Sequence, residues 1–258
     1  MGRERVILRQ APDYDPERIR SVIKKGLEEL CLVPSSYQHI TIKPNVVMAH
    51  RKVAPSAYTR PEFLDGLLQA LQDSDCNRPQ ITITEKCGAE IPTTRMFRRA
   101  GYFKLKKKHN IGILLDRERI WNHNYHLDEK IVDLLEVGYP DFIATDAVEI
   151  SMGGNHLTQQ GYPLGLILMA KNPVAHDAVC AHLFHIDPHK IPHLRLAHER
   201  GYGPLELEQI EITGDTSLEK MQERTSDWKT GFIRVDAVDC GIEVLAGEPY
   251  CTGGCHGG

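Results

Sequence analysis

Cysteines and a histidine gather in a glycine-rich stretch at the end of the sequence, and these residue types bind metals. Cys251 and Cys255 lie four positions apart, His256 follows directly, and Cys240 lies eleven positions before Cys251. Thiolates and imidazoles are the ligands that hold zinc or iron–sulfur clusters. Cys251, Cys255 and Cys240 are therefore the candidate metal ligands, and the cofactor they indicate is an iron–sulfur cluster or zinc.

The two thiols closest to the end do not complete a tetrahedral metal site, which takes four ligands. Cys240 is an available third ligand, and Cys87 a fourth if the tail folds back over the sheet. The alternative is a weakly held tail with free thiols, because a glycine-rich chain end is poorly tied down. We also expect that the natural chain continues past Gly258 or that a second module begins there.

A second set of candidate residues follows the strands that the sequence predicts. Lys43 and Asn45 follow the second strand, Glu85 follows the third, and Gly153-Gly154 lies beyond the fifth. Ligands of open α/β sheets bind beyond the carboxyl ends of the strands. We therefore expect a pocket for an anionic small molecule, in which Lys43 neutralises negative charge and Glu85 acts as the general base. Consecutive glycines would offer backbone N–H groups to the same anion.

The sequence also allows other interpretations of these strand-end residues. The Lys-Pro-Asn run is also a common strand-ending turn, and the glycine pair is also a plain loop. Asp146 and Glu149 follow the fifth strand and belong to the same set of strand-end residues.

Arg60 is a further candidate because it lies where a helix is predicted to begin. The run Thr59-Arg60-Pro61-Glu62 matches a capping box, in which Thr59 caps the helix without any ligand. A helix N-terminus also binds carboxylates and phosphates. Arg60 is therefore either an anion ligand or part of a helix start, and the sequence favours neither.

Histidines are abundant between residues 176 and 198. His176 and Cys180 lie four positions apart, which suits a metal on one face of a helix. Asp187-Pro188 interrupts the helix further on, however, and no His-Glu-x-x-His pattern is present. We expect these histidines to lie on solvated or partly buried helix faces, and Asp177 to interact with the helix dipole.

Apolar periodicity predicts strands that alternate with helices along the chain. The strands are expected at 6–8, 39–42, 81–84, 111–115, 142–144, 164–170, 210–212 and 232–235, and the helices at 16–30, 60–71, 93–108, 128–137, 174–186 and 191–200. This alternation is typical of an α/β protein with a mostly parallel sheet, helices on both faces and Rossmann-like layering. We expect one α/β domain over residues 1–240 and a Gly/Cys-rich tail over 241–258.

Composition excludes several classes of protein. The net charge of −4 gives no basic face for nucleic acid, and no apolar stretch approaches the length of a membrane span, so we expect neither partner. The N-terminus lacks the apolar core of a signal peptide. Seven cysteines, an odd number, argue against a disulfide scaffold, and we expect a cytoplasmic protein.

Several segments together resemble the family known as domain of unknown function 362. The resemblance begins at Ile42-Lys43-Pro44-Asn45 and Thr59-Arg60-Pro61, and it continues through residues 139–147, 161–168, 172–179 and 197–203. It spans most of residues 6–214, and the order and spacing of the segments carry it. Many relatives look like iron–sulfur proteins with ferredoxin-type cysteine motifs, so the resemblance implies a metal or cluster near Cys251 and Cys255. No ferredoxin-type Cys-x-x-Cys-x-x-Cys run occurs in this sequence.

Three hypotheses of function follow. The first is a metal- or iron–sulfur-associated α/β protein, of redox type, that binds an anionic small molecule at the strand ends. The second is a non-catalytic metal- or cluster-carrying module that docks a partner, for which a redox protein is the expected candidate. The third is a scaffold domain whose tail thiols bind nothing.

Overall fold

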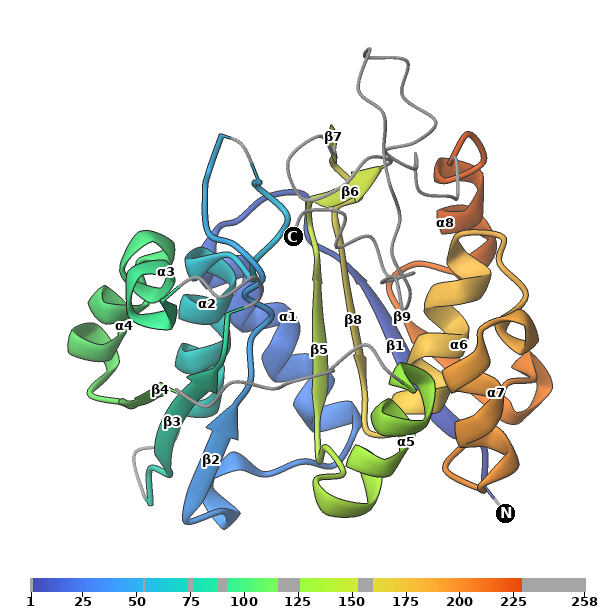
Figure 1. Ribbon diagram of the computed structural model, residues 1–258, viewed down its shortest axis with the longest axis horizontal. Coiled ribbons are helices and arrows are strands. Elements are labelled where there is room, and N and C mark those ends of the chain that lie inside the picture. Colours follow the sequence, from blue (N-terminus) through green and yellow to red (C-terminus); the bar gives the residue numbers. More distant parts are fainter. Residues whose placement is uncertain are drawn as a thin grey trace.

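Nine strands and eight α-helices form in the computed structural model, which describes residues 2–52, 54–73, 77–87, 92–115, 126–152 and 160–228 (Figure 1). They confirm the predicted α/β class. The strands are β1 (Glu4–Gln10), β2 (His39–Ile42), β3 (Gln80–Glu85), β4 (Gly112–Leu115), β5 (Ile143–Ala147), β6 (Ile150–Met152), β7 (Gln160–Tyr162), β8 (Leu166–Ala170) and β9 (Ile210–Gly214).

The helices are α1 (Pro16–Glu29), α2 (Pro61–Leu71), α3 (Thr93–Ala100), α4 (Tyr102–His109), α5 (Leu127–Val137), α6 (Pro173–Leu183), α7 (Pro192–Glu199) and α8 (Leu218–Arg224). Seven of the eight helices coincide with segments that apolar periodicity predicted, whereas α8 was not predicted. Within the described ranges, none of these helices has the length and apolar character needed to cross a bilayer.

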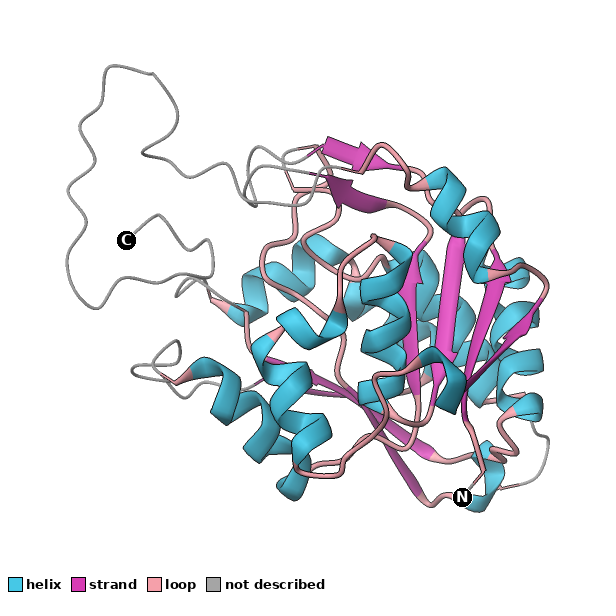
Figure 2. Ribbon diagram, turned by 90° about the vertical axis from the view of Figure 1, so that its right-hand side faces the viewer, coloured by secondary structure: helices cyan, strands magenta, loops and turns pink. Residues whose placement is uncertain are grey.

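The strands form two main sheets rather than one (Figure 2). The order β2-β3-β4 is all parallel, whereas the order β5-β8-β1-β9 is mixed because β8 runs antiparallel to both β5 and β1. Between β5 and β8, the described residues form the antiparallel pair β6 and β7, whereas a parallel arrangement would need a crossover connection. The expectation of a mostly parallel sheet is thus met only by β2-β3-β4, and the Rossmann-like layering stays a prediction.

Strands β1 and β8 are buried on both faces, which explains their continuous apolar runs. Ile7 and Met169 belong to a core that includes α1, α2, α3 and α4, while Val6 and Leu168 belong to a second core under α5, α6, α7 and α8. Successive side chains of a strand point to opposite faces, so a strand covered on both sides needs apolar residues throughout. Helices therefore cover both faces of the mixed sheet, as predicted.

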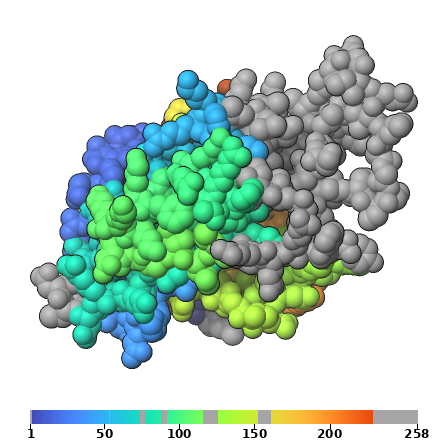
Figure 3. All heavy atoms as spheres, turned by 60° about the vertical axis from the view of Figure 1, so that its left-hand side comes forward, coloured from blue at the N-terminus to red at the C-terminus, as the bar shows by residue number. Residues whose placement is uncertain are grey.

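One helix of the first core differs from its prediction. The segment 93–108 forms two helices, because Gly101 has φ +86° and ends α3 in a left-handed conformation. Glycine adopts this conformation at little cost and commonly ends helices. The chain then turns into α4, and the two helices form the outer surface beside the parallel sheet (green in Figure 3).

Candidate functional site

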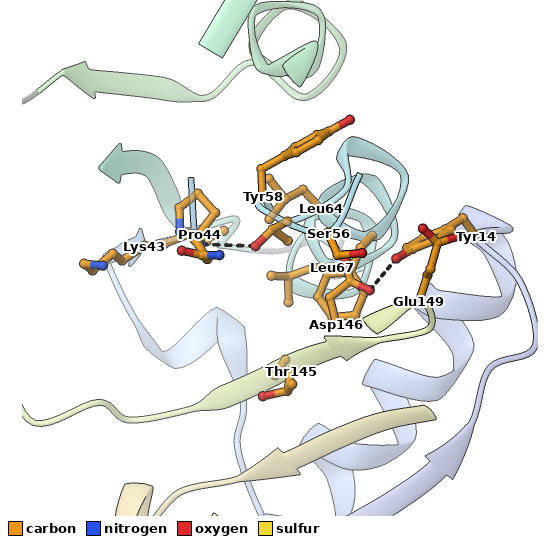
Figure 4. Close-up of a pocket in the computed structure, with 15 residues that line it drawn as sticks. Tyr14, Lys43, Pro44, Ser56, Tyr58, Leu64, Leu67, Thr145, Asp146 and Glu149 are labelled. Carbon is orange, nitrogen blue, oxygen red and sulfur yellow. Dashed lines mark hydrogen bonds between the residues drawn. The ribbon is translucent and has the colours of Figure 1, made fainter. Parts of the chain in front are cut away.

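A pocket of about 310 Å³ lies between β2 and β5, at the carboxyl ends of these strands (Figure 4). Part of its lining is apolar and comes from Ile42, Phe63, Leu64, Leu67 and Ala144. The rest carries hydroxyl, amide and carboxylate groups. A volume near 300 Å³ with a few convergent polar groups is typical of a site for a small molecule.

Asp146, on β5, places a partly buried carboxylate in this pocket. Its Oδ1 accepts a hydrogen bond from the Tyr14 hydroxyl at 3.0 Å, and its Oδ2 accepts one from the backbone N–H of Arg60 at 3.1 Å. Burial raises the pKa of Asp146 to about 6, although these two donors and the Val148 backbone N–H favour the ionised form. A carboxyl group with this pKa changes its charge near neutral pH.

Tyr14 is held in place from several sides. Its hydroxyl oxygen also accepts a hydrogen bond from the backbone N–H of Glu149, and burial raises the pKa of Tyr14 above its usual value. The Arg60 guanidinium carbon lies 4.7 Å from the centre of the Tyr14 ring. Tyr14 therefore stays protonated and donates to Asp146, with the Arg60 cation over its ring.

The helix start at Arg60 binds an anion, and that anion is the protein's own Asp146. The backbone N–H of Arg60, the N-cap of α2, points at the carboxylate, as expected for the positive end of a helix dipole. The capping box predicted for Thr59 is wrong, because α2 begins one residue later and no side chain caps it.

Thr59 closes the base of the loop that precedes α2. Its Oγ1 accepts a hydrogen bond from the Asn45 backbone N–H at 3.1 Å, and its own N–H donates to the Asn45 carbonyl at 2.8 Å. The Tyr102 hydroxyl donates to the Thr59 carbonyl at 2.6 Å. The Thr59 side chain therefore does not cap α2. Its bonds hold the backbone of Asn45, which lines the pocket.

The Lys43 ammonium forms an ion pair with Glu85, its Nζ lying 2.6 Å from Oε2. The Lys43 side chain is 72% exposed, and it lies on the opposite side of the pocket from Tyr14, Asp146 and Glu149 (Figure 4). Lys43 and Asn45 line the pocket, whereas Glu85 is not among its lining residues. The second carboxylate oxygen of Glu85 accepts the N–H of Lys86 at 2.7 Å. The general-base role of Glu85 stays a prediction, and the geometry favours Asp146 for that role.

Ser56 adds an unsatisfied polar group to the pocket. Its Oγ is buried and has no hydrogen-bond partner among the described residues, although it lies in the pocket lining. Leaving a buried hydroxyl unpaired costs about 1–3 kcal/mol, so such groups normally bond to a ligand or a water molecule. Neither Ser56 nor Tyr14 stood out in the sequence, because each belongs to a loop without a recognisable motif.

The remaining predicted site residues lie outside the described part of the chain. They are Gly153, Gly154, Cys240, Cys251 and Cys255. Cys87 is described, and burial raises the pKa of its thiol to about 11. A thiol with this pKa stays protonated at neutral pH as long as no metal ion binds it.

The described residues do not provide a site for an iron–sulfur cluster. Such clusters are held mainly by several cysteine thiolates. The cysteines of the described ranges are Cys31 beyond α1, Cys87 beyond β3 and Cys180 in α6. They come from separate elements, and the one group of metal-binding side chains found in these ranges contains a single cysteine.

That group consists of His176, Asp177 and Cys180, whose ligand atoms all lie within 4.8 Å of one another. His176 is buried, so the expectation of a solvated or partly buried face is wrong for it. Burial disfavours its charged form, but interactions with Cys180 and Asp177 outweigh burial and raise the pKa of His176 above its usual value. The helical spacing of His176 and Cys180 was the signal in the sequence, and the contribution of the intervening Asp177 was missed.

Comparison with known proteins gives one family. The model of the family described as Domain of unknown function (DUF362) matches residues 40–116 and 107–182. No curated protein and no solved structure matches this chain. The matched residues include Lys43 and Asn45 after β2, the strand β5 with Asp146, and all of α6 except its last residue.

Proposed function

The chain belongs to the DUF362 family, and we propose that it binds a small polar molecule in the pocket between β2 and β5 and exchanges a proton with it through Asp146. The observation that carries this proposal is a carboxyl group of pKa about 6 facing a pocket of about 310 Å³. General acids and bases work best when their pKa lies near the operating pH. Perturbed carboxyl groups in clefts are also frequent at functional sites.

The two ends of the pocket suit different groups of one ligand. Lys43 and Asn45 lie at one end and offer donors to an anionic group, which agrees with the expected anionic small molecule. The Lys43 side chain is 72% exposed, whereas that of Glu85 is 11% exposed, so a ligand anion would bind the solvent side of the ammonium beside Glu85. The carboxylates of Asp146 and Glu149 at the other end accept hydrogen bonds from a hydroxyl or amine. This combination fits a small hydroxycarboxylic acid.

A thermal-shift screen with small hydroxycarboxylates tests this proposal. We expect at least one compound to raise the melting temperature of the full chain, and Lys43→Ala to weaken its binding by about tenfold, the effect of losing roughly 1.4 kcal/mol. Ser56→Ala should also weaken binding, because the ligand loses a hydroxyl partner. Isothermal titration of each variant with the compound found in the screen gives the affinities.

Lys24→Ala is the matched control, because Lys24 is also an exposed lysine in an ion pair, but on α1 with Asp73. It should bind the compound as the unmodified chain does. Equal binding by the Lys43→Ala and Lys24→Ala variants would contradict the assignment of the anionic end. A screen in which the Asp146→Asn variant binds as well as the unmodified chain would contradict the pocket itself.

We propose separately that Cys240, Cys251 and Cys255 associate with zinc or an iron–sulfur cluster, as their residue types and the family resemblance indicate. A redox function would depend on that cofactor. Metal and acid-labile sulfide analysis of anaerobically purified protein tests this. The triple cysteine-to-serine variant should contain less metal than the unmodified chain, and equal metal content would refute the proposal.

A further inference from the structure

His176, Asp177 and Cys180 converge near the start of α6, on the opposite face of β5 from the pocket. The His176 Nδ1 lies 2.7 Å from the Asp177 Oδ1 and 3.9 Å from the Cys180 Sγ. Zinc lies about 2.0 Å from a histidine nitrogen and about 2.3 Å from a thiolate sulfur, so it spans at most about 4.3 Å between them. A single ion can therefore contact all three side chains with small adjustments.

The imidazole of His176 is oriented by its other nitrogen. Nε2 lies 2.9 Å from the Oγ1 of Thr145, on β5, and donates its proton there, whereas the proton that Nδ1 shares with Asp177 would leave when Nδ1 binds a metal. A hydrogen bond from the second ring nitrogen of this kind fixes the tautomer and the ring plane of metal-binding histidines. Asn172 accepts hydrogen bonds from Val174 and Ala175 and so fixes the first turn of α6.

The same side chains are less well arranged for a nucleophilic Cys180 with His176 as its base. Sγ of Cys180 lies 3.9 Å from Nδ1 and 4.0 Å from Nε2, which is the outer limit of a hydrogen bond to sulfur. Both nitrogens of His176 are moreover engaged by Asp177 and Thr145.

We propose that His176 Nδ1, Cys180 Sγ and the Asp177 carboxylate bind a divalent transition-metal ion of the zinc class, with a fourth position open to solvent. A neutral imidazole, a thiolate and a carboxylate carry two negative charges, which balance the ion. Imidazole and thiolate together select zinc-like ions over magnesium or calcium. The Asp177 side chain is 52% exposed, which gives the ion a path from solvent, whereas that of His176 is 5% exposed.

The proposed site consists of described residues and requires neither the tail cysteines nor a pocket ligand, although Thr145 both contacts His176 and lines the pocket. Thr145 connects it to the pocket through the backbone of β5, since Thr145 and the neighbouring Asp146 point in different directions (Figure 4). Failure of the metal site would leave the proposed small-molecule function untouched, because no metal enters that proposal for Asp146.

Cobalt substitution in the full chain tests the site. The background variant carries Cys240→Ser, Cys251→Ser and Cys255→Ser, so that no tail thiol contributes. We expect Co²⁺ to bind this background with a thiolate-to-cobalt charge-transfer band, and Cys180→Ser to abolish the band. Asp177→Asn, a change of nearly equal size at a side chain that is 52% exposed, should weaken Co²⁺ binding by at least tenfold.

Cys31→Ser is the matched control, because Cys31 is an exposed free cysteine beyond α1. It should leave the band and the affinity for Co²⁺ unchanged. Absence of the band in the background variant, or a band that survives Cys180→Ser, would overturn the proposal. The three side chains would then serve only as a hydrogen-bonded link between α6 and β5.

Discussion

Replacing Asp146 with asparagine should remove a large part of the pH dependence of stability between pH 4 and pH 7. The pKa of Asp146 is about 6 in the folded protein and 3.8 in the unfolded chain. The folded state therefore holds this proton when the unfolded state has lost it, and the unfolding free energy falls as pH rises through this window. Two pH units at about 1.4 kcal/mol each give a fall of up to about 3 kcal/mol.

Denaturant unfolding of both proteins at several pH values measures this effect. The unfolding free energy of the Asp146→Asn variant, relative to the unmodified chain, should increase by up to about 3 kcal/mol from pH 4 to pH 7. Asp141→Asn, at an exposed position just before β5, is the control and should follow the unmodified chain. A difference that stays constant with pH would contradict the raised pKa of Asp146.

Gly214→Ala is expected to destabilise the protein strongly. Gly214 ends β9 with φ +123°, and a Cβ atom there would lie 1.8 Å from the carbonyl oxygen of its β1 partner Leu8. That oxygen already accepts the Asp215 N–H at 3.1 Å, so it cannot move away without breaking the ladder. We expect a loss of about 3–5 kcal/mol, which lowers the melting temperature by roughly 10 °C.

Gly201→Ala is the control for Gly214→Ala, because it introduces backbone strain without a steric clash. Gly201 has φ +81°, also in the left-handed region, but no atom lies within 4 Å of the position that a Cβ atom would take there. Its substitution should cost about 1 kcal/mol, as strain alone does. Similar melting temperatures for the two variants would contradict the packing of β9 on β1. That packing also matters for the pocket, because the chain leaves β1 and reaches Tyr14 within a few residues.

The sequence predicted the elements well because local rules determine them. Asp15 caps α1 and accepts from the Glu17 N–H, as the Asp-Pro-Glu run indicated. The runs at β1 and β8 were apolar enough to identify strands. Strand direction was harder to predict, because the antiparallel orientation of β8 depends on the pair β6 and β7. These two strands are too short for alternating polar and apolar residues to identify them in the sequence.

The pocket could be predicted in position but only partly in composition. The strand-end rule located Lys43 and Asn45 correctly in the pocket wall. It gave no means of ranking Asp146 above Glu85, because only Asp146 lines the pocket, and this difference depends on tertiary packing. Tyr14 comes from the loop after β1, far from Asp146 in sequence, and only the fold brings the two together.

The most direct test of the proposed site is an NMR titration of the Asp146 carboxyl carbon, assigned by its loss in the Asp146→Asn variant. We predict a midpoint near pH 6, because burial disfavours the ionised form. A hydroxycarboxylate bound in the pocket should shift this midpoint. A midpoint at or below the ordinary value of 3.8, unchanged by every compound of the screen, would contradict a proton-exchanging role for Asp146.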